Sequence, residues 1–137
     1  MTDLKIAKER LDGHTICLCK DKNCLFSEKK GIAPLMGFIA EGIDLTGYSV
    51  ADLVVGKAAA LLMVKCNIKA VFAKTLSKSG QEVLKANNIP VEYEVLAEKI
   101  INREGTDVCP MEKTVLNTDD PEEGYVLLKA KIESMKK

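Results

Sequence analysis

Residues 50–66 constrain the fold most, because they are apolar almost without interruption. Charged side chains break this run only at Asp52, Lys57 and Lys65. A helix that is hydrophobic nearly all round must be covered on several sides, so we predict a central, buried helix here. Ser49 is expected to cap its first turn, and Asp52, three residues later, completes a capping-box pattern. The run is too short and too interrupted to predict a membrane span.

The rest of the chain alternates between helical and strand patterns. The strand–helix–strand unit over residues 69–96 should be a right-handed parallel crossover. Residues 1–137 are therefore expected to form a single α/β domain, with a mixed sheet in a three-layer α/β/α arrangement. The predicted helices cover residues 2–12, 32–41, 77–87, 110–116 and 125–135, and the predicted strands cover 14–20, 24–28, 69–74 and 91–96.

Composition narrows the function classes. The 20 basic and 20 acidic residues give a net charge of zero, and the chain has no Trp. Both facts argue against a nucleic-acid-binding surface. Residues 1–12 do not have the pattern of a signal peptide. The five cysteines are odd in number and irregularly spaced, which predicts no disulfide framework and a cytoplasmic location. Cys17 and Cys19 fall on one face of a strand and are expected to be core thiols.

Two segments carry a resemblance to a known fold. The predicted strand over residues 70–74 is followed by Thr75 and Leu76, and Val50-Ala51-Asp52 lies upstream of it. In these features and in the order of elements, about residues 10–97 resemble the cytidine-deaminase-like fold. Zinc deaminases of that fold have H-A-E where this chain has Val50-Ala51-Asp52, so Val50 replaces the zinc ligand. They have P-C-x-x-C after the T-L exit, where residues 78–82 read K-S-G-Q-E.

Zinc-activated attack on an aminopyrimidine is therefore not expected, although Asp52 could stand in for the proton-shuttling Glu of those enzymes. The whole chain is more similar to a prokaryotic family of unknown function that keeps this fold without the zinc motifs. The matching features are the segment V-A-D-L-V-V-G-K-A-A-A and the later C-P-M-E. This resemblance implies the fold and no particular activity.

Lys57 is the first candidate for a site residue. A lysine in an apolar helix loses solvation, which lowers its pKa and favours anion binding or nucleophilic attack. The alternative is that its stem packs while its ammonium reaches water. Gly56-Lys57 is not a phosphate loop, since the other glycine and the final hydroxyl are missing. Ser79 and Gly80 lie where a strand meets a helix, and free N–H groups there can hold an anion.

Cys109 is the second candidate, at a predicted helix start. Pro110 fits the first helical position and Glu112 the third. A thiol at a helix N-terminus has its thiolate stabilised by the dipole, so Cys109 could act as a nucleophile or a redox thiol. The alternative is a half-buried thiol without chemistry. In the preceding polar loop, Arg103 could clamp an anion and Asp107 could add hydrogen bonds.

The sequence thus favours a small domain that binds a nucleoside-like or anionic small molecule without a metal or cofactor. Two alternatives remain: a thiol-dependent enzyme using Cys109, and a diverged zinc enzyme with Cys109, Asp52 and Glu112 as ligands. We expect no nucleic-acid or membrane partner. The apolar residues 32–40 could form a homo-oligomer contact or part of the core. The candidate catalytic residues are Asp52, Lys57 and Cys109, and the candidate ligand-binding residues are Ser79, Gly80, Arg103, Asp107 and Glu112.

Overall fold

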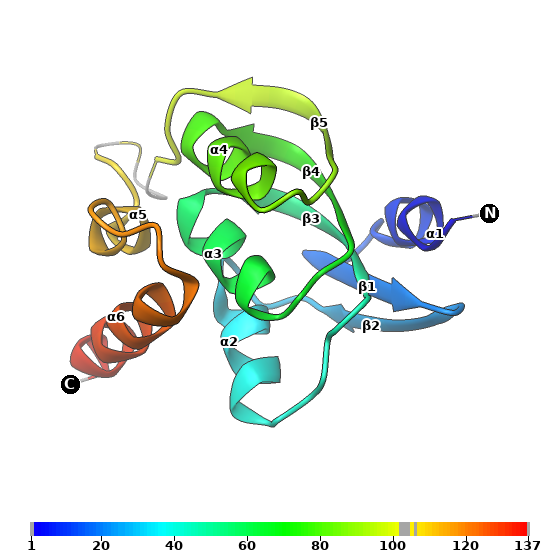
Figure 1. Ribbon diagram of the computed structural model, residues 1–137, viewed down its shortest axis with the longest axis horizontal. Coiled ribbons are helices and arrows are strands. Elements are labelled where there is room, and N and C mark those ends of the chain that lie inside the picture. The colour runs from blue at the N-terminus through cyan, green and yellow to red at the C-terminus, as the bar shows by residue number, and fades with distance from the viewer. Residues whose placement is uncertain (1, 102–104, 106, 137) are drawn as a thin grey trace.

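A computed structural model describes residues 2–101, 105 and 107–136 of the chain. Within this part, the strands form one five-stranded sheet in the order β2-β1-β3-β4-β5 (Figure 1). β1 runs antiparallel to both β2 and β3, whereas β3, β4 and β5 are parallel to one another. The predicted α/β class with a mixed sheet is confirmed. The strands are β1 (Ile16–Lys20), β2 (Asn23–Ser27), β3 (Ser49–Val55), β4 (Ala70–Ser77) and β5 (Val91–Ala97).

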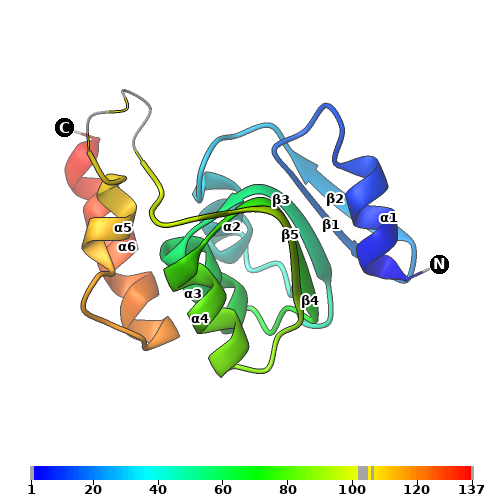
Figure 2. The same ribbon diagram turned by 90° about the horizontal axis from the view of Figure 1, so that it is seen from above.

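The helices cover the two faces of the sheet unequally. α1 lies alone against one face, while α2, α3 and α4 lie against the other, and α5 and α6 pack outside α3 (Figures 1 and 2). The buried apolar residues accordingly divide into a small cluster under α1 and a larger one around α3. The helices are α1 (Asp3–Arg10), α2 (Ala33–Ala40), α3 (Lys57–Lys65), α4 (Lys78–Ala86), α5 (Pro110–Thr114) and α6 (Pro121–Met135).

Local signals placed several elements correctly. The hairpin β1–β2 turns through Asp21 and Lys22, which both have positive φ, as two-residue hairpin turns require. α4 is capped by Ser77, whose hydroxyl accepts a hydrogen bond from the N–H of Gly80. β4 and β5 pair in parallel on either side of α4 in the chain, which confirms the predicted parallel crossover. α6 begins at Pro121, four residues before the predicted start, because Asp120 caps it.

The predicted central helix is wrong in its first half. Residues Ser49–Val55 form β3, the middle strand of the sheet, and the helix α3 begins only at Lys57. Ser49 and Asp52 therefore cap nothing, and Asp52 is paired with Ile16 on one side and Ala73 on the other. A strand buried on both faces is a continuous apolar run, so its sequence has no alternation to distinguish it from a buried helix. Gly56, expected inside the helix, is its N-cap.

The expectation about disulfides is also corrected. Cys19 and Cys24 form a disulfide, while Cys17, Cys66 and Cys109 are free. The reason is the hairpin register, which puts Cys19 directly opposite Cys24 on the neighbouring strand. Counting cysteines did not reveal this, because the pairing depends on where the turn falls.

The second half of the apolar run is as buried as predicted. Residues 58–63 of α3 are all buried, enclosed by β3, α4 and α6. Gly124 of α6 permits a close approach, since a Cβ atom there would lie 3.0 Å from Cδ1 of Leu61. The segment 32–40, expected to be core or oligomer contact, forms α2 with Leu35 buried in the larger cluster. No helix in the described ranges is long and apolar enough to cross a membrane.

Candidate functional site

The N-terminus of α3 is the centre of the candidate site, because α4, α5 and Ile100 all lie against it. The backbone N–H groups of Lys57 and Ala58 each donate a hydrogen bond of 2.7 Å to the carboxylate of Glu112 on α5. A helix N-terminus attracts negative charge, and here the chain supplies that charge itself. Glu112, a predicted ligand-binding residue, is therefore engaged with the backbone of α3.

Gly56 makes this arrangement possible. A Cβ atom at Gly56 would lie 2.6 Å from Cδ of Glu112 and 2.8 Å from Cγ1 of Ile100, so any side chain would displace its neighbours. Gly80 has the matching role on α4, where a Cβ atom would approach the carbonyl carbon and oxygen of Gly56 to 3.0 Å. The two glycines therefore let the N-termini of α3 and α4 pack together at the carboxyl ends of β3 and β4, where open α/β sheets bind ligands.

The ammonium group of Lys57 is the main cation of the site. Its Nζ atom lies 3.2 Å from the carbonyl oxygen of Leu116 and 3.1 Å from Oδ1 of Asp119. The Lys57 side chain is only 12% exposed, whereas that of Asp119 is 90% exposed. The partly enclosed charge of Lys57 is thus neutralised by a carboxylate that lies almost entirely in solvent.

A cavity of about 300 Å³ opens beside this ammonium group. Ser79 provides a hydroxyl, which lies 3.2 Å from the hydroxyl of Ser77. Glu82 adds a carboxylate, and Asn87 adds an amide whose Nδ2 donates a 2.8 Å hydrogen bond to the carbonyl of Val83. We call this the Lys57 cavity, and its lining residues are Lys57, Ser79, Glu82, Val83, Ala86, Asn87 and Asp119.

The structure brings together some of the predicted site residues. Lys57 and Ser79 share the cavity, and Gly80 lies behind it at the contact of α3 with α4. Sequence reasoning missed Glu82, Asn87 and Asp119. Glu82 on α4 and Asn87 at its C-cap both fall in the helix predicted over residues 77–87, which also contains Ser79, and this was the available signal for those two. Nothing in the sequence signalled Asp119.

Cys109 does not line the Lys57 cavity. It occupies the N-cap position of α5, as predicted, with Pro110 in the first turn, but its side chain makes no capping hydrogen bond. Asp107 is exposed, and its pKa is lowered mainly by a hydrogen bond from the side chain of Lys113. Arg103 lies outside the described residues.

Asp52 lies within the sheet and away from the lining of the cavity. It is 5% exposed, and its Oδ2 atom is buried without a hydrogen-bond partner in the described part of the chain. Burial raises the pKa of Asp52 to about 8, although hydrogen bonds from the backbone of Val54 and Leu53 lower it in part. At neutral pH the side chain is therefore mainly protonated. Asp52 is thus an interior residue of the sheet and does not line the cavity.

The ligand set of the zinc hypothesis is not assembled. Among the described residues, the His, Cys, Asp and Glu side chains close enough to share one ion in a group of three are Cys17, Cys19 and Cys24. Asp52, Cys109 and Glu112 form no such group.

Fold and site together define a small α/β domain with a polar cavity that extends from the N-terminus of α3 along one side of α4. The chain belongs to the family described as Domain of unknown function (DUF1893), TM1506, whose model matches residues 6–132. It is similar to the crystal structure of a DUF1893 family protein (TM1506) from Thermotoga maritima. The identity is 27% and the TM-score 0.82, over 93% of this chain and 86% of that one.

No curated protein matches the chain. The predicted membership of a family of unknown function is confirmed. The likeness to the cytidine-deaminase fold stays a prediction, since the matches identify the family and its structure without reference to a deaminase.

Proposed function

We propose that this domain binds a small polar molecule with an anionic group in the Lys57 cavity. The observation that carries the proposal is the unequal exposure of the Lys57–Asp119 pair, at 12% and 90%. An exposed carboxylate gains little from an ion pair, about 0–1 kcal/mol, because water solvates it almost as well. A carboxylate or phosphate group on a ligand can therefore replace Asp119 beside Nζ of Lys57.

The opposite wall of the cavity favours a ligand that also has neutral polar groups. Ser79 and Asn87 can donate and accept hydrogen bonds, while the carboxylate of Glu82 accepts them from hydroxyl or amino groups. The volume of about 300 Å³ is at the lower end for ligand pockets. A nucleoside-like molecule with an acidic substituent has this combination of groups, and its choice as the ligand class rests on the fold resemblance.

Binding of an anionic ligand can be tested by screening the full chain for a raised melting temperature with nucleosides, nucleotides and small carboxylates. Compounds that stabilise the chain are then titrated by calorimetry. Lys57→Met keeps the apolar stem and removes the charge, so it should abolish binding. Lys65→Met is the matched control, because Lys65 is also on α3 and pairs with an exposed carboxylate, that of Glu122. It should leave binding unchanged.

Asp119→Asn distinguishes a competing carboxylate from a ligand contact. If the ligand anion replaces Asp119, the variant should bind the same compound more tightly than the unmodified chain does. Weaker binding by Asp119→Asn would show that Asp119 holds the ligand, which would refute the proposed exchange. Unchanged binding by Lys57→Met would exclude the cavity as the site, as would a screen in which no anion stabilises the chain.

A further inference from the structure

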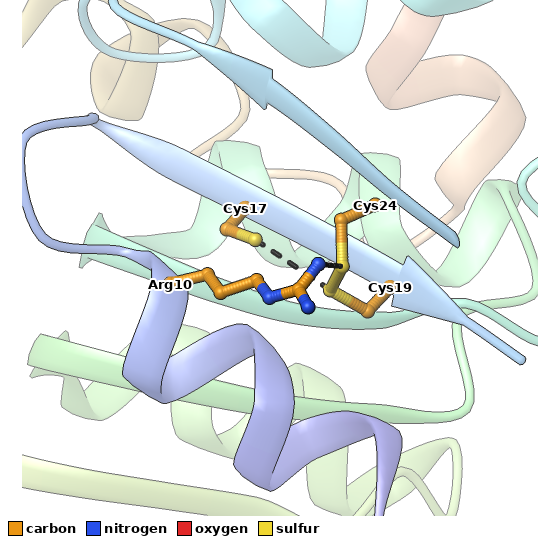
Figure 3. The surroundings of a disulfide bond; sticks show 4 residues. All are labelled: Arg10, Cys17, Cys19 and Cys24. Atoms are coloured by element: carbon orange, nitrogen blue, oxygen red, sulfur yellow. Dashed lines mark hydrogen bonds between the residues drawn. A yellow bond between two sulfur atoms is a disulfide. The ribbon is translucent and has the colours of Figure 1, made fainter. Parts of the chain in front are cut away.

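Three cysteine sulfurs gather under α1, on the sheet face opposite the Lys57 cavity. Cys17 and Cys19 come from β1 and Cys24 from β2 (Figure 3). Their Sγ atoms all lie within 4.8 Å of one another, and those of Cys17 and Cys19 are 3.6 Å apart. Cys19 and Cys24 are joined as a disulfide, which leaves Cys17 as a free thiol beside it.

The hairpin itself creates this cluster. Residues two apart on a strand point to the same face, so Cys17 and Cys19 both face α1. The register then places Cys24 opposite Cys19. Cys17 and Cys19 are fully buried in the smaller apolar cluster, where Leu11 and Phe72 are also buried, whereas Cys24 is half-buried. Apolar groups therefore enclose Cys17 and Cys19, whereas Cys24 is the partly exposed member of the cluster.

The spacing matches the geometry of metal–thiolate sites. With metal–sulfur bonds of about 2.3 Å, two sulfurs on one ion are about 3.8 Å apart in tetrahedral geometry and about 4.0 Å apart in trigonal geometry. The 3.6 Å between Cys17 and Cys19 is within about 0.4 Å of both values. Reduction of the disulfide would free the half-buried Cys24 side chain to rotate away from Cys19.

We propose that, once the Cys19–Cys24 disulfide is reduced, Cys17, Cys19 and Cys24 bind one thiophilic metal ion. A dithiol reductant gives two electrons and two protons to the Cys19–Cys24 bond and is itself oxidised to a disulfide. The three thiols then release their protons as the ion binds, because thiolate is the ligand form.

Arg10 compensates the charge of such a site. Its Nη1 atom donates a hydrogen bond to Sγ of Cys24 at 3.6 Å (Figure 3). Three thiolates with a monovalent or divalent ion have a net negative charge, which an adjacent guanidinium stabilises. Soft sulfur ligands select ions such as Cu⁺ and Zn²⁺. Three sulfurs complete the coordination of Cu⁺, whereas Zn²⁺ would require a water molecule as its fourth ligand, so Cu⁺ fits the cluster better.

The test uses the full chain, reduced and then freed of reductant without oxygen. Cu⁺ is titrated from a chromophoric chelator, and Zn²⁺ is titrated in parallel with a metal indicator. We expect one Cu⁺ per chain with thiolate–metal absorption in the near ultraviolet, and weaker Zn²⁺ binding. Cys17→Ser and Cys24→Ser should each remove this site. Cys66→Ser and Cys109→Ser are the matched controls, since these free cysteines lie outside the cluster, and both should keep it.

Arg10→Gln should weaken Cu⁺ binding by about tenfold, the smaller of the losses typical when a group that hydrogen-bonds to a metal ligand is removed. The oxidised chain should bind no ion. The proposal is overturned if the reduced chain holds Cu⁺ no better than Cys24→Ser does, or if Cys109→Ser loses binding to the same extent. Circular dichroism of Cys24→Ser checks that this half-buried position tolerates the change, so that lost binding reports on the ligand and not on folding.

Discussion

Asp52→Asn should remove a pH dependence that the buried carboxyl group imposes on stability. Asp52 is 5% exposed on the middle strand of the sheet, and burial raises its pKa from an ordinary value of 3.8 to about 8. Between these two values the folded chain keeps the proton of Asp52, while the unfolded chain loses it. The stability contributed by the protonated group is complete below pH 4 and is lost progressively as pH rises toward about 8.

The size of the effect follows from the single proton involved. Within this window the folded state binds one more proton than the unfolded state, so the free energy of unfolding falls by about 1.4 kcal/mol per pH unit. Between pH 5 and 7 the loss is therefore about 2.7 kcal/mol. Asn is nearly the same shape as a protonated Asp and does not ionise, so the variant should lack this loss.

The measurement is urea unfolding of both proteins at pH 5, 6 and 7. The difference in unfolding free energy between Asp52→Asn and the unmodified chain cancels the titration of all other groups. It should shift in favour of the variant by about 1.4 kcal/mol for each pH unit. Asp44→Asn is the control: the pKa of exposed Asp44 is lowered by hydrogen bonds from Thr46, so its ionisation is complete in this range. A constant difference for Asp52→Asn would refute the protonated, buried state of Asp52.

Three further substitutions test the packing around the site. Glu112→Gln should lower the free energy of unfolding by about 1–2 kcal/mol, because a neutral amide has one acceptor oxygen for the two N–H groups that now share the carboxylate. Thermal unfolding measures this loss, with Glu94→Gln, at an exposed position on β5, as the control. Gly56→Ala should displace Glu112, so the double variant should cost less than the two single variants summed, and additive costs would contradict the contact. Leu128→Ala, at a fully buried position on α6, should cost about 2–5 kcal/mol, against about 0.5 kcal/mol for the more exposed Leu127→Ala. Equal costs would show that α6 does not pack on the domain.

Signals confined to a few neighbouring residues were enough for much of the fold. Asp21 and Lys22 form the turn between the two predicted strands 14–20 and 24–28, and Ser77 caps the helix predicted over residues 77–87. Pro110 marks the start of α5 in the same way. Such signals are reliable because the hydrogen bonds and dihedral angles involved join residues at most four apart. Lys57 and Ser79 line one cavity because each follows a strand in the parallel part of the sheet, but only the strand before Ser79 was predicted.

The tertiary structure alone decided how the apolar run divides. An uninterrupted hydrophobic segment fits a buried strand and a buried helix equally, so only pairing with β1 and β4 makes residues 49–55 a strand. Contacts that depend on how strands and helices pair and pack could not be predicted from the sequence either. Glu112 binds the N-terminus of α3 from 55 residues away, and Cys24 meets Cys19 through the hairpin register. Composition and spacing set which groups the chain has, but their partners depend on which surfaces the sheet and helices bring into contact.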